Sequence, residues 1–142
     1  MNGDQIIKSE TLSPEERLGL TRATLHVLDD WNLTESQMVQ LLALEGQVKP
    51  RHLYRYRESE PFPDNPETWT RVDHILHIAE ALMTSYPTNP KAGGRWMHHP
   101  HRRFRKMSPL QLILETGREG LSRVRMELDC CYAWERTGSV RN

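Results

Sequence analysis

The stretch ETWTRVDHILHIAEALMTSY, residues 67–86, decides the fold class. Its apolar side chains recur every three or four positions, which is the spacing of one face of an α-helix. These side chains are Trp69, Val72, Ile75, Leu76, Ala79, Leu82, Met83 and Tyr86. No pair of segments elsewhere in the sequence predicts paired strands. We therefore expect an all-α protein.

Two more helices follow this stretch, and each has its own start signal. Asn89-Pro90 predicts the beginning of a helix that carries Trp96, and Ser108-Pro109 predicts the beginning of the next. A small polar residue before proline suits both starts, since the first caps the helix and the second fits its first turn. Three apolar helical patterns therefore run from Trp69 to Trp134.

The last of these patterns is interrupted by two glycines, Gly117 and Gly120. We expect them to bracket a break between helices, because glycine often ends a helix. The final helix is then predicted from about Leu121 to Trp134.

The N-terminal part holds three shorter predicted helices. Ser13-Pro14-Glu15-Glu16 has the pattern of a capping box and predicts a helix that reaches about Trp31. Thr34 and Gln37 repeat the pattern and predict a helix over 34–44. A turn at Gly46 precedes a third helix, predicted over 50–57.

Three prolines and Asn65 between residues 59 and 66 predict an extended linker. We therefore expect two subdomains: a helix-turn-helix-like unit over 1–63 and a small helical domain over 64–142. A chain of 142 residues suits one compact domain or two very small ones.

The 19 basic and 19 acidic side chains cancel, but they are segregated along the chain. Residues 1–48 hold three basic and eight acidic side chains, 49–57 four basic and no acidic ones, and 91–106 six basic and no acidic ones. Local patches, rather than the total, decide what a surface attracts.

No apolar run approaches the roughly 20 residues that span a bilayer, and no secretory signal is visible at the N-terminus. The two cysteines are adjacent and point in different directions on a helix, so they are poor candidates for a mutual disulfide. We expect a cytoplasmic protein that does not interact with membranes.

The first basic patch suggests a DNA-binding site. In a helix-turn-helix the second helix enters the major groove, and here that helix would present Lys49, Arg51, Tyr54 and Arg55 opposite an inward Leu53. An ordinary three-helix unit with a solvated basic face explains the same residues, and both interpretations stay open.

The second patch, Lys91–Lys106, suits nucleic acid or an acidic protein. We favour a structural role for its aromatic residues Trp96 and Phe104 as core anchors. His98, His99 and His101 do not predict a metal site, because no acid accompanies them and the surrounding cations oppose a metal ion. We expect neither a metal nor a cofactor.

Nothing in the sequence predicts catalysis. There is no phosphate-binding loop, no nucleophile elbow and no carboxylate pair, and Cys130-Cys131 lacks an activating base. We therefore expect that the protein is not an enzyme.

The last predicted helix has two apolar stripes. Leu121, Val124, Leu128 and Cys131 form the stripe that packs inward; Met126, Cys130 and Ala133 form a second on nearly the opposite side. The second stripe either docks a partner, with Tyr132 and Trp134 as anchors, or is buried between subdomains.

The C-terminal half resembles the toxin-binding domain of the Xre/MbcA/ParS antitoxins, and the N-terminal half more loosely resembles their Xre-type helix-turn-helix. The resemblance is carried by Arg71, Ile75 to Leu82, Pro87 to Ala92, Trp96-Met97, Pro100, Phe104, Ser108-Pro109-Leu110, Gly117, Gly120, Val124 and Leu128. One departure is Arg105-Lys106-Met107, where the family pattern has a small residue such as glycine.

The resemblance implies a partner toxin with a RES domain, which degrades NAD or transfers ADP-ribose, and whose active site the antitoxin blocks. It also implies homodimers and, for many members, repression of their own operon through operator DNA. The toxin-touching surface is then expected at Arg102, Arg103, Arg105, Met126, Cys130, Tyr132, Ala133, Trp134, Arg136 and Arg141. The rival interpretation is a stand-alone DNA-binding regulator whose C-terminal half only dimerises.

Overall fold

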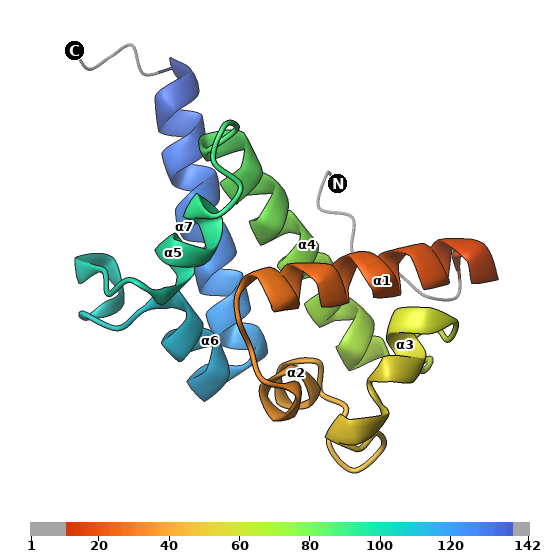
Figure 1. Ribbon diagram of the computed structural model, residues 1–142. Helices are drawn as coiled ribbons and strands as arrows, with labels where there is room; N and C mark the ends of the chain where they lie inside the picture. The colour runs from red at the N-terminus through yellow and green to blue at the C-terminus, as the bar shows by residue number, and fades with distance from the viewer. Residues whose placement is uncertain (1–10, 138–142) are drawn as a thin grey trace. The chain divides into compact units, whose positions relative to one another are not determined.

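The computed structural model describes residues 11–137, with side chains as far as residue 130, and most of this part of the chain is helical (Figure 1). It contains no strand; its one extended pairing is an isolated bridge between His101 and Met107. The prediction of an all-α protein is confirmed. The helices are α1 (Pro14–Asp30), α2 (Glu35–Leu41), α3 (Tyr54–Glu58), α4 (Pro66–Ser85), α5 (Ala92–His98), α6 (Pro109–Thr116) and α7 (Arg118–Thr137), with 3-10 turns η2 (Pro50–His52) and η3 (Arg102–Phe104).

The chain forms two compact units, Met1–Leu76 and His77–Asn142, and the boundary along the sequence falls within α4. The segment predicted as a linker, 59–66, is irregular as far as residue 65 and packs within the first unit, and its last residue begins α4. Phe62 is buried, and its backbone N–H donates to the Thr21 hydroxyl at 3.0 Å. The functional boundary between residues 63 and 64 stays a prediction.

Helix starts in the first unit follow the capping signals of the sequence. The Ser13 hydroxyl accepts from the Glu16 N–H at 3.0 Å, and the Glu16 carboxylate accepts from the Ser13 N–H at 2.8 Å. Thr34 and Gln37 form the same reciprocal pair at the start of α2. Each box satisfies backbone donors that a helix start leaves unpaired, so both predicted starts are confirmed.

Two predicted helices of this unit end or divide earlier than expected. The helix after Thr34 ends at Leu41, because Ala43 takes a left-handed conformation (φ 59°) that turns Leu44 back into the core. The segment predicted as one helix over 50–57 is the 3-10 turn η2 followed by the five-residue α3. Neither piece has a side-chain cap, and a helix this short does not recover the cost of its first turn.

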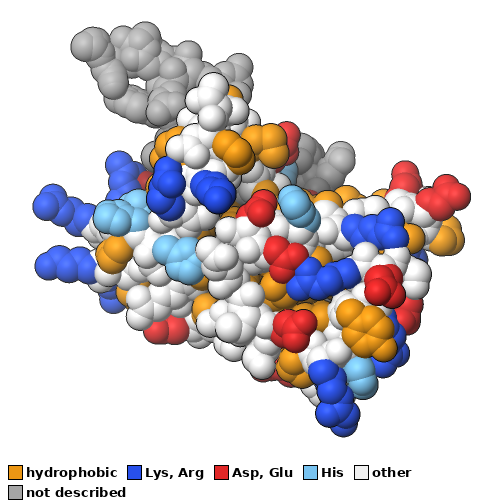
Figure 2. All heavy atoms as spheres, viewed as in Figure 1, with side chains coloured by type: hydrophobic (Ala, Val, Ile, Leu, Met, Phe, Trp, Pro, Cys, Tyr) orange, Lys and Arg blue, Asp and Glu red, His pale blue; other side chains and the backbone are white. Residues whose placement is uncertain are grey.

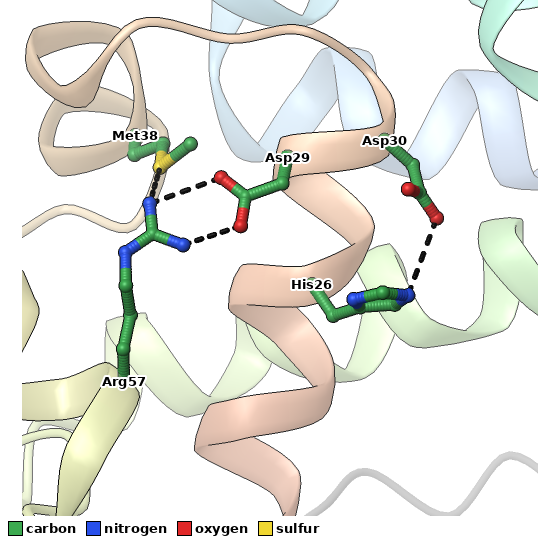
Figure 3. A network of polar contacts seen from close by, with 5 residues as sticks. All are labelled: His26, Asp29, Asp30, Met38 and Arg57. Carbon is green, nitrogen blue, oxygen red and sulfur yellow. Dashed lines mark hydrogen bonds and ion pairs between the residues drawn. The ribbon is translucent and has the colours of Figure 1, made fainter.

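An ion-pair network holds α3 against α1 (Figure 3). The Arg57 guanidinium donates to both carboxylate oxygens of Asp29, one of them at 3.0 Å, and lies 3.7 Å from the Met38 sulfur. The hydrogen bond to Asp29 raises the pKa of Arg57, while partial burial opposes the rise. Arg57 therefore ties three helices together, and it is not available to a ligand.

The second unit is organised by a close approach of α6 and α7 (Figure 1). Gly117 ends α6 with φ 67°, and α7 begins at the next residue. Gly120 is buried inside α7, where a Cβ atom would lie 2.3 Å from the Thr116 hydroxyl and 2.7 Å from the Leu112 carbonyl oxygen. The predicted break between Gly117 and Gly120 is therefore wrong: only Gly117 interrupts the helices, and Gly120 permits them to pack.

The start of α5 also differs from the prediction. Asn89 does cap a turn, since its side-chain oxygen accepts from the Lys91 N–H at 3.2 Å. The helix itself begins at Ala92, with Lys91 as the preceding residue. The prediction that Ser108 starts α6 is confirmed, because its hydroxyl accepts from the Gln111 N–H at 3.0 Å.

Candidate functional site

The basic segment after α5 forms a closed loop, His101–Met107. The His101 N–H donates to the Met107 carbonyl at 3.1 Å, and the Lys106 N–H donates to the His101 carbonyl at 3.0 Å. The Lys106 bond and the bond from the Arg105 N–H to the Arg102 carbonyl at 3.1 Å have the 6→1 and 5→2 pattern of a Schellman motif. We call this segment the basic loop.

The departure from the family pattern, Arg105-Lys106-Met107, lies in the basic loop. Arg105 and Lys106 both have positive φ, 55° and 68°. Arg105 occupies the left-handed position of the motif, where glycine is favoured because it carries no Cβ. Two charged residues are thus held in a conformation that costs roughly 1–2 kcal/mol per non-glycine residue. Strain of this kind is often found where a loop has a function.

Aromatic side chains pack together at the base of the basic loop and hold it in place. Phe104 is buried, as expected of a core anchor, whereas Trp96 is only partly buried. The His101 ring lies 4.8 Å from the Trp96 ring and 6.1 Å from the Phe104 ring, between centroids. Its Nε2 atom is also 3.2 Å from the Trp96 carbonyl oxygen. The histidine therefore has a structural role in positioning the loop.

Two contacts join the loop to α7. The Arg103 guanidinium forms an ion pair with the Glu127 carboxylate, and the Arg123 guanidinium donates to the Arg103 carbonyl at 3.0 Å. Arg123 also lies over the Phe104 ring, 5.8 Å from its centroid. Sequence reasoning missed both anchors on α7, because nothing local links residues 20 or more positions apart.

These contacts leave three cations of the loop exposed. Arg102, Arg105 and Lys106 form no side-chain hydrogen bond or ion pair within the described residues. Figure 2 shows Lys, Arg and His side chains gathered on the side where Figure 1 places the segment between α5 and α6. The loop therefore presents a rigid positive surface.

A groove on α7 continues this surface. Its volume is about 540 Å³, and Arg123 and Glu127, the two anchors of the basic loop, line it. Met126 and Cys130 line it as well and are exposed, Met126 to 63%. The remaining lining residues are Leu112, Thr116, Glu119, Gly120 and Ser122.

The structure thus brings together five of the residues predicted to touch a toxin: Arg102, Arg103, Arg105, Met126 and Cys130. Their contact with a toxin stays a prediction. Arg141 lies outside the described residues. The backbone of α7 includes four more predicted residues, whose side chains lie outside the described part: Tyr132, Ala133, Trp134 and Arg136.

The other predicted site lies in the first unit. All four predicted residues are exposed: Lys49 directly before η2, Arg51 in η2, and Tyr54 and Arg55 in α3. Leu53 is fully buried, as expected. Partial burial and the neighbouring cations, Arg55 first, lower the pKa of His52 from its usual 6.5. The cations of the patch therefore act on the pKa of His52 in the same direction as burial, which is the larger cause.

A second, smaller pocket of about 220 Å³ lies between α4 and α7, lined by His77, Glu80, Ala81, Thr84 and Asp129. In the part of the chain that the structure describes, no group of three or more His, Cys, Asp or Glu side chains is arranged to hold a metal ion. No helix there has the length and apolar character to cross a membrane.

The comparisons with known proteins bear on the second unit. Residues 79–132 match the family described as the antitoxin Xre/MbcA/ParS C-terminal toxin-binding domain. This range includes the basic loop and the described part of the α7 groove. No curated protein and no solved structure matches the chain significantly. The match confirms the resemblance to the Xre/MbcA/ParS antitoxins over residues 79–132 and supports an antitoxin role.

Proposed function

We propose that the chain is an antitoxin that neutralises a RES-type toxin, which consumes NAD or transfers ADP-ribose, by covering its active site. The observation that carries the proposal is the match of residues 79–132 to an antitoxin toxin-binding domain. The RES type rests on the family resemblance of the sequence. Blocking a cleft requires tight contact and no catalytic group, so the protein is not an enzyme and acts without a cofactor.

The surface that we assign to the toxin combines the basic loop with the exposed face of α7. Arg102 and Arg105 supply cations without a partner inside the described chain, and Met126 adds a flexible apolar side chain that adapts to a partner. Arginines surrounding an apolar centre are typical of residues that dominate binding energy. We also assign to Arg136 and Arg141, whose side chains lie outside the described part of the chain, a pairing with acids in the toxin pocket.

Charge reversal in the basic loop tests this surface. The double variant Arg102→Glu and Arg105→Glu, co-expressed with the toxin of the adjacent gene, is expected to lose growth rescue and co-purification. Lys91→Glu makes the same kind of charge change on an exposed residue of the same unit outside the proposed surface, and it should rescue growth fully. Equal rescue by both proteins would remove the loop from the mechanism.

Truncation tests the end of α7. A chain that stops after Asp129 lacks Tyr132, Ala133, Trp134, Arg136 and Arg141, and we expect it to bind the toxin weakly. Circular dichroism of the truncated chain checks that its helices remain. Unchanged rescue by a folded truncated chain would show that these residues are not needed.

We also propose that the first unit represses its own operon by binding operator DNA through Lys49, Arg51, Tyr54 and Arg55. Because α3 has only five residues, we expect phosphate contacts to dominate over base recognition, and affinity to fall steeply with salt. Arg51→Glu with Arg55→Glu should abolish operator binding in a gel-shift assay and leave toxin inhibition intact. Operator binding by the wild-type chain without any toxin inhibition would favour the rival, a stand-alone regulator. Unchanged DNA binding by the variant would contradict the proposed site.

We propose that the protein acts in the cytoplasm, where the exposed Cys130 thiol stays reduced. We further propose that it forms homodimers, as the resemblance to the antitoxin family implies.

A further inference from the structure

Helix α5 carries a further group of basic side chains, which the proposed function does not use. Lys91, directly before α5, and Arg95 are exposed, and neither side chain forms a hydrogen bond or an ion pair within the described residues. His98 and His99 are exposed at the end of the helix. We call these four residues the α5 face. No acidic residue occurs in the sequence from 81 to 114, so no neighbour along the chain compensates its charge.

The helical spacing turns the α5 face away from the core. Successive residues of an α-helix are rotated by about 100°, so Lys91 and Arg95, four positions apart, point in nearly the same direction. The opposite side of the helix is the packed one. Met97 is buried there, and a Cβ atom at Gly93 would lie 3.3 Å from the Leu82 Cβ. Figure 2 shows Lys, Arg and His side chains around the place of α5 in Figure 1.

The α5 face lacks the apolar side chain that anchors most protein partners. Residues that dominate binding between proteins are mostly large side chains that fill desolvated pockets. On α5 these side chains are turned inward: Met97 is buried, and Trp96 is partly buried against the His101 ring, 4.8 Å away between centroids. On α7, by contrast, Met126 is 63% exposed. Surfaces that bind DNA are more polar and more positively charged than protein interfaces, and the α5 face has this character.

We propose that the α5 face is a second DNA-binding site of the chain, which contacts the phosphates of duplex DNA through Lys91 and Arg95. From Lys91 to His98 the helix rises about 10 Å, which is the length of about three nucleotides of one strand. Phosphate contacts carry no sequence information of their own. The α5 face therefore adds affinity for DNA of any sequence.

The α5 face shares no residue with the other two proposed sites. The toxin surface consists of the basic loop and the exposed face of α7, and the operator site lies within residues 49–55. Because α3 in that operator site has only five residues, a separate source of phosphate contacts raises the affinity of the whole chain for DNA. Changes in the α5 face should leave toxin inhibition intact.

The salt dependence of DNA binding tests the α5 face. Fluorescence anisotropy gives the affinity of the full chain for a short labelled duplex of arbitrary sequence at a series of salt concentrations. Each phosphate contact contributes roughly 0.9 to the slope of log affinity against log salt concentration. Lys91→Gln with Arg95→Gln should therefore lower the slope by about 1.8. Between about 50 and 200 mM salt, the wild type should lose about tenfold more affinity than this variant. A variant with the wild-type slope would overturn the proposal.

Gln111→Glu is the matched control for net charge. It lowers the charge of the same unit by one, as Arg95→Gln does, at an exposed position on α6. Arg95→Gln should lower the slope by about 0.9, whereas Gln111→Glu should leave it unchanged. Equal slopes for these two variants would show that net charge alone sets the affinity, which would also overturn the proposal. Circular dichroism checks that both variants are folded.

Toxin inhibition and the first-unit variant separate this site from the proposed function. A lower slope for Lys91→Gln with Arg95→Gln, in a chain that never inhibits the toxin, would refute the antitoxin proposal and leave the α5 face intact. The same holds for the operator site if Arg51→Glu with Arg55→Glu binds the operator as the wild type does.

Two other ligands of the α5 face would contradict the proposal. If Lys91→Gln with Arg95→Gln keeps the wild-type slope but no longer inhibits the toxin, the face belongs to the toxin surface. If the wild type binds vesicles of anionic phospholipid and not duplex DNA, the cations serve a lipid surface. We expect neither result.

Discussion

Replacing Gly120 with alanine should destabilise the second unit. A Cβ atom at this position would lie 2.3 Å from the Thr116 hydroxyl, 2.7 Å from the Leu112 carbonyl oxygen and 2.9 Å from the Ile113 Cα. Two of these neighbours are backbone atoms of α6, which cannot rotate out of the way as the end of a flexible side chain does. The substitution therefore requires α6 and α7 to move apart.

The magnitude follows from two opposing effects. Alanine gains about 1 kcal/mol over glycine in a helix interior, whereas overpacking a tight contact costs about 1–3 kcal/mol and sometimes more. Since all three distances are below normal van der Waals contact, the cost should lie at the upper end. We expect a net loss of about 2 kcal/mol.

Gly19→Ala is the matched control. Gly19 lies inside α1, and a Cβ atom there would meet nothing within 4 Å. It should stabilise the first unit by about 0.5–1 kcal/mol, since only the helix propensity changes. Urea unfolding followed by circular dichroism measures both variants. Gly120→Ala with unchanged or higher stability would refute the close helix crossing.

Three further predictions concern single side chains. Arg105→Gly removes the cost of a left-handed arginine and should raise stability by about 0.5–1 kcal/mol in urea unfolding, yet weaken toxin binding in calorimetry; a destabilised variant would contradict the Schellman geometry. The pKa of His52 is lowered by partial burial and nearby cations, so the unfolded chain binds the proton more readily and stability falls as the pH drops through 6.5. His52→Gln should flatten this part of the pH profile, and an identical profile would show that His52 is not the group responsible. Arg57→Ala should cost at most about 1 kcal/mol through loss of its partly exposed pair with Asp29, with Arg55→Ala, whose nearest acid is 4.0 Å away, as the neutral control in thermal unfolding.

The features predicted correctly from the sequence depend on neighbouring residues. Ser13, Thr34 and Ser108 cap helices because a hydroxyl and an N–H three positions later are brought together by the helix itself. The long pattern of α4 predicted its helix because burial repeats with the helical period. The capping and periodicity signals together were enough to establish an all-α chain.

The features that sequence reasoning missed depend on residues far apart in the chain. Gly120 was taken for a helix breaker, since only its packing on α6 shows that the missing side chain is what matters. The pair of Arg103 with Glu127 is set by the path of the basic loop.

The candidate site was predicted in part. The sequence predicted a second apolar stripe on α7. Its members Met126 and Cys130 are exposed, so the described chain does not cover them. The continuity of this stripe with the basic loop required the structure, because Arg123 and Glu127 join them through contacts with Arg103. Which residues a toxin touches depends on the shape of the partner, and one chain does not contain that information.

The most direct measurement of the central claim is a titration of the purified chain with the product of the adjacent toxin gene, followed by calorimetry and by NAD turnover. We predict a stable complex in which turnover falls in proportion to the antitoxin bound, and in which Arg102→Glu with Arg105→Glu weakens both readouts together. A toxin that keeps its full activity in the presence of saturating, folded antitoxin would contradict the account.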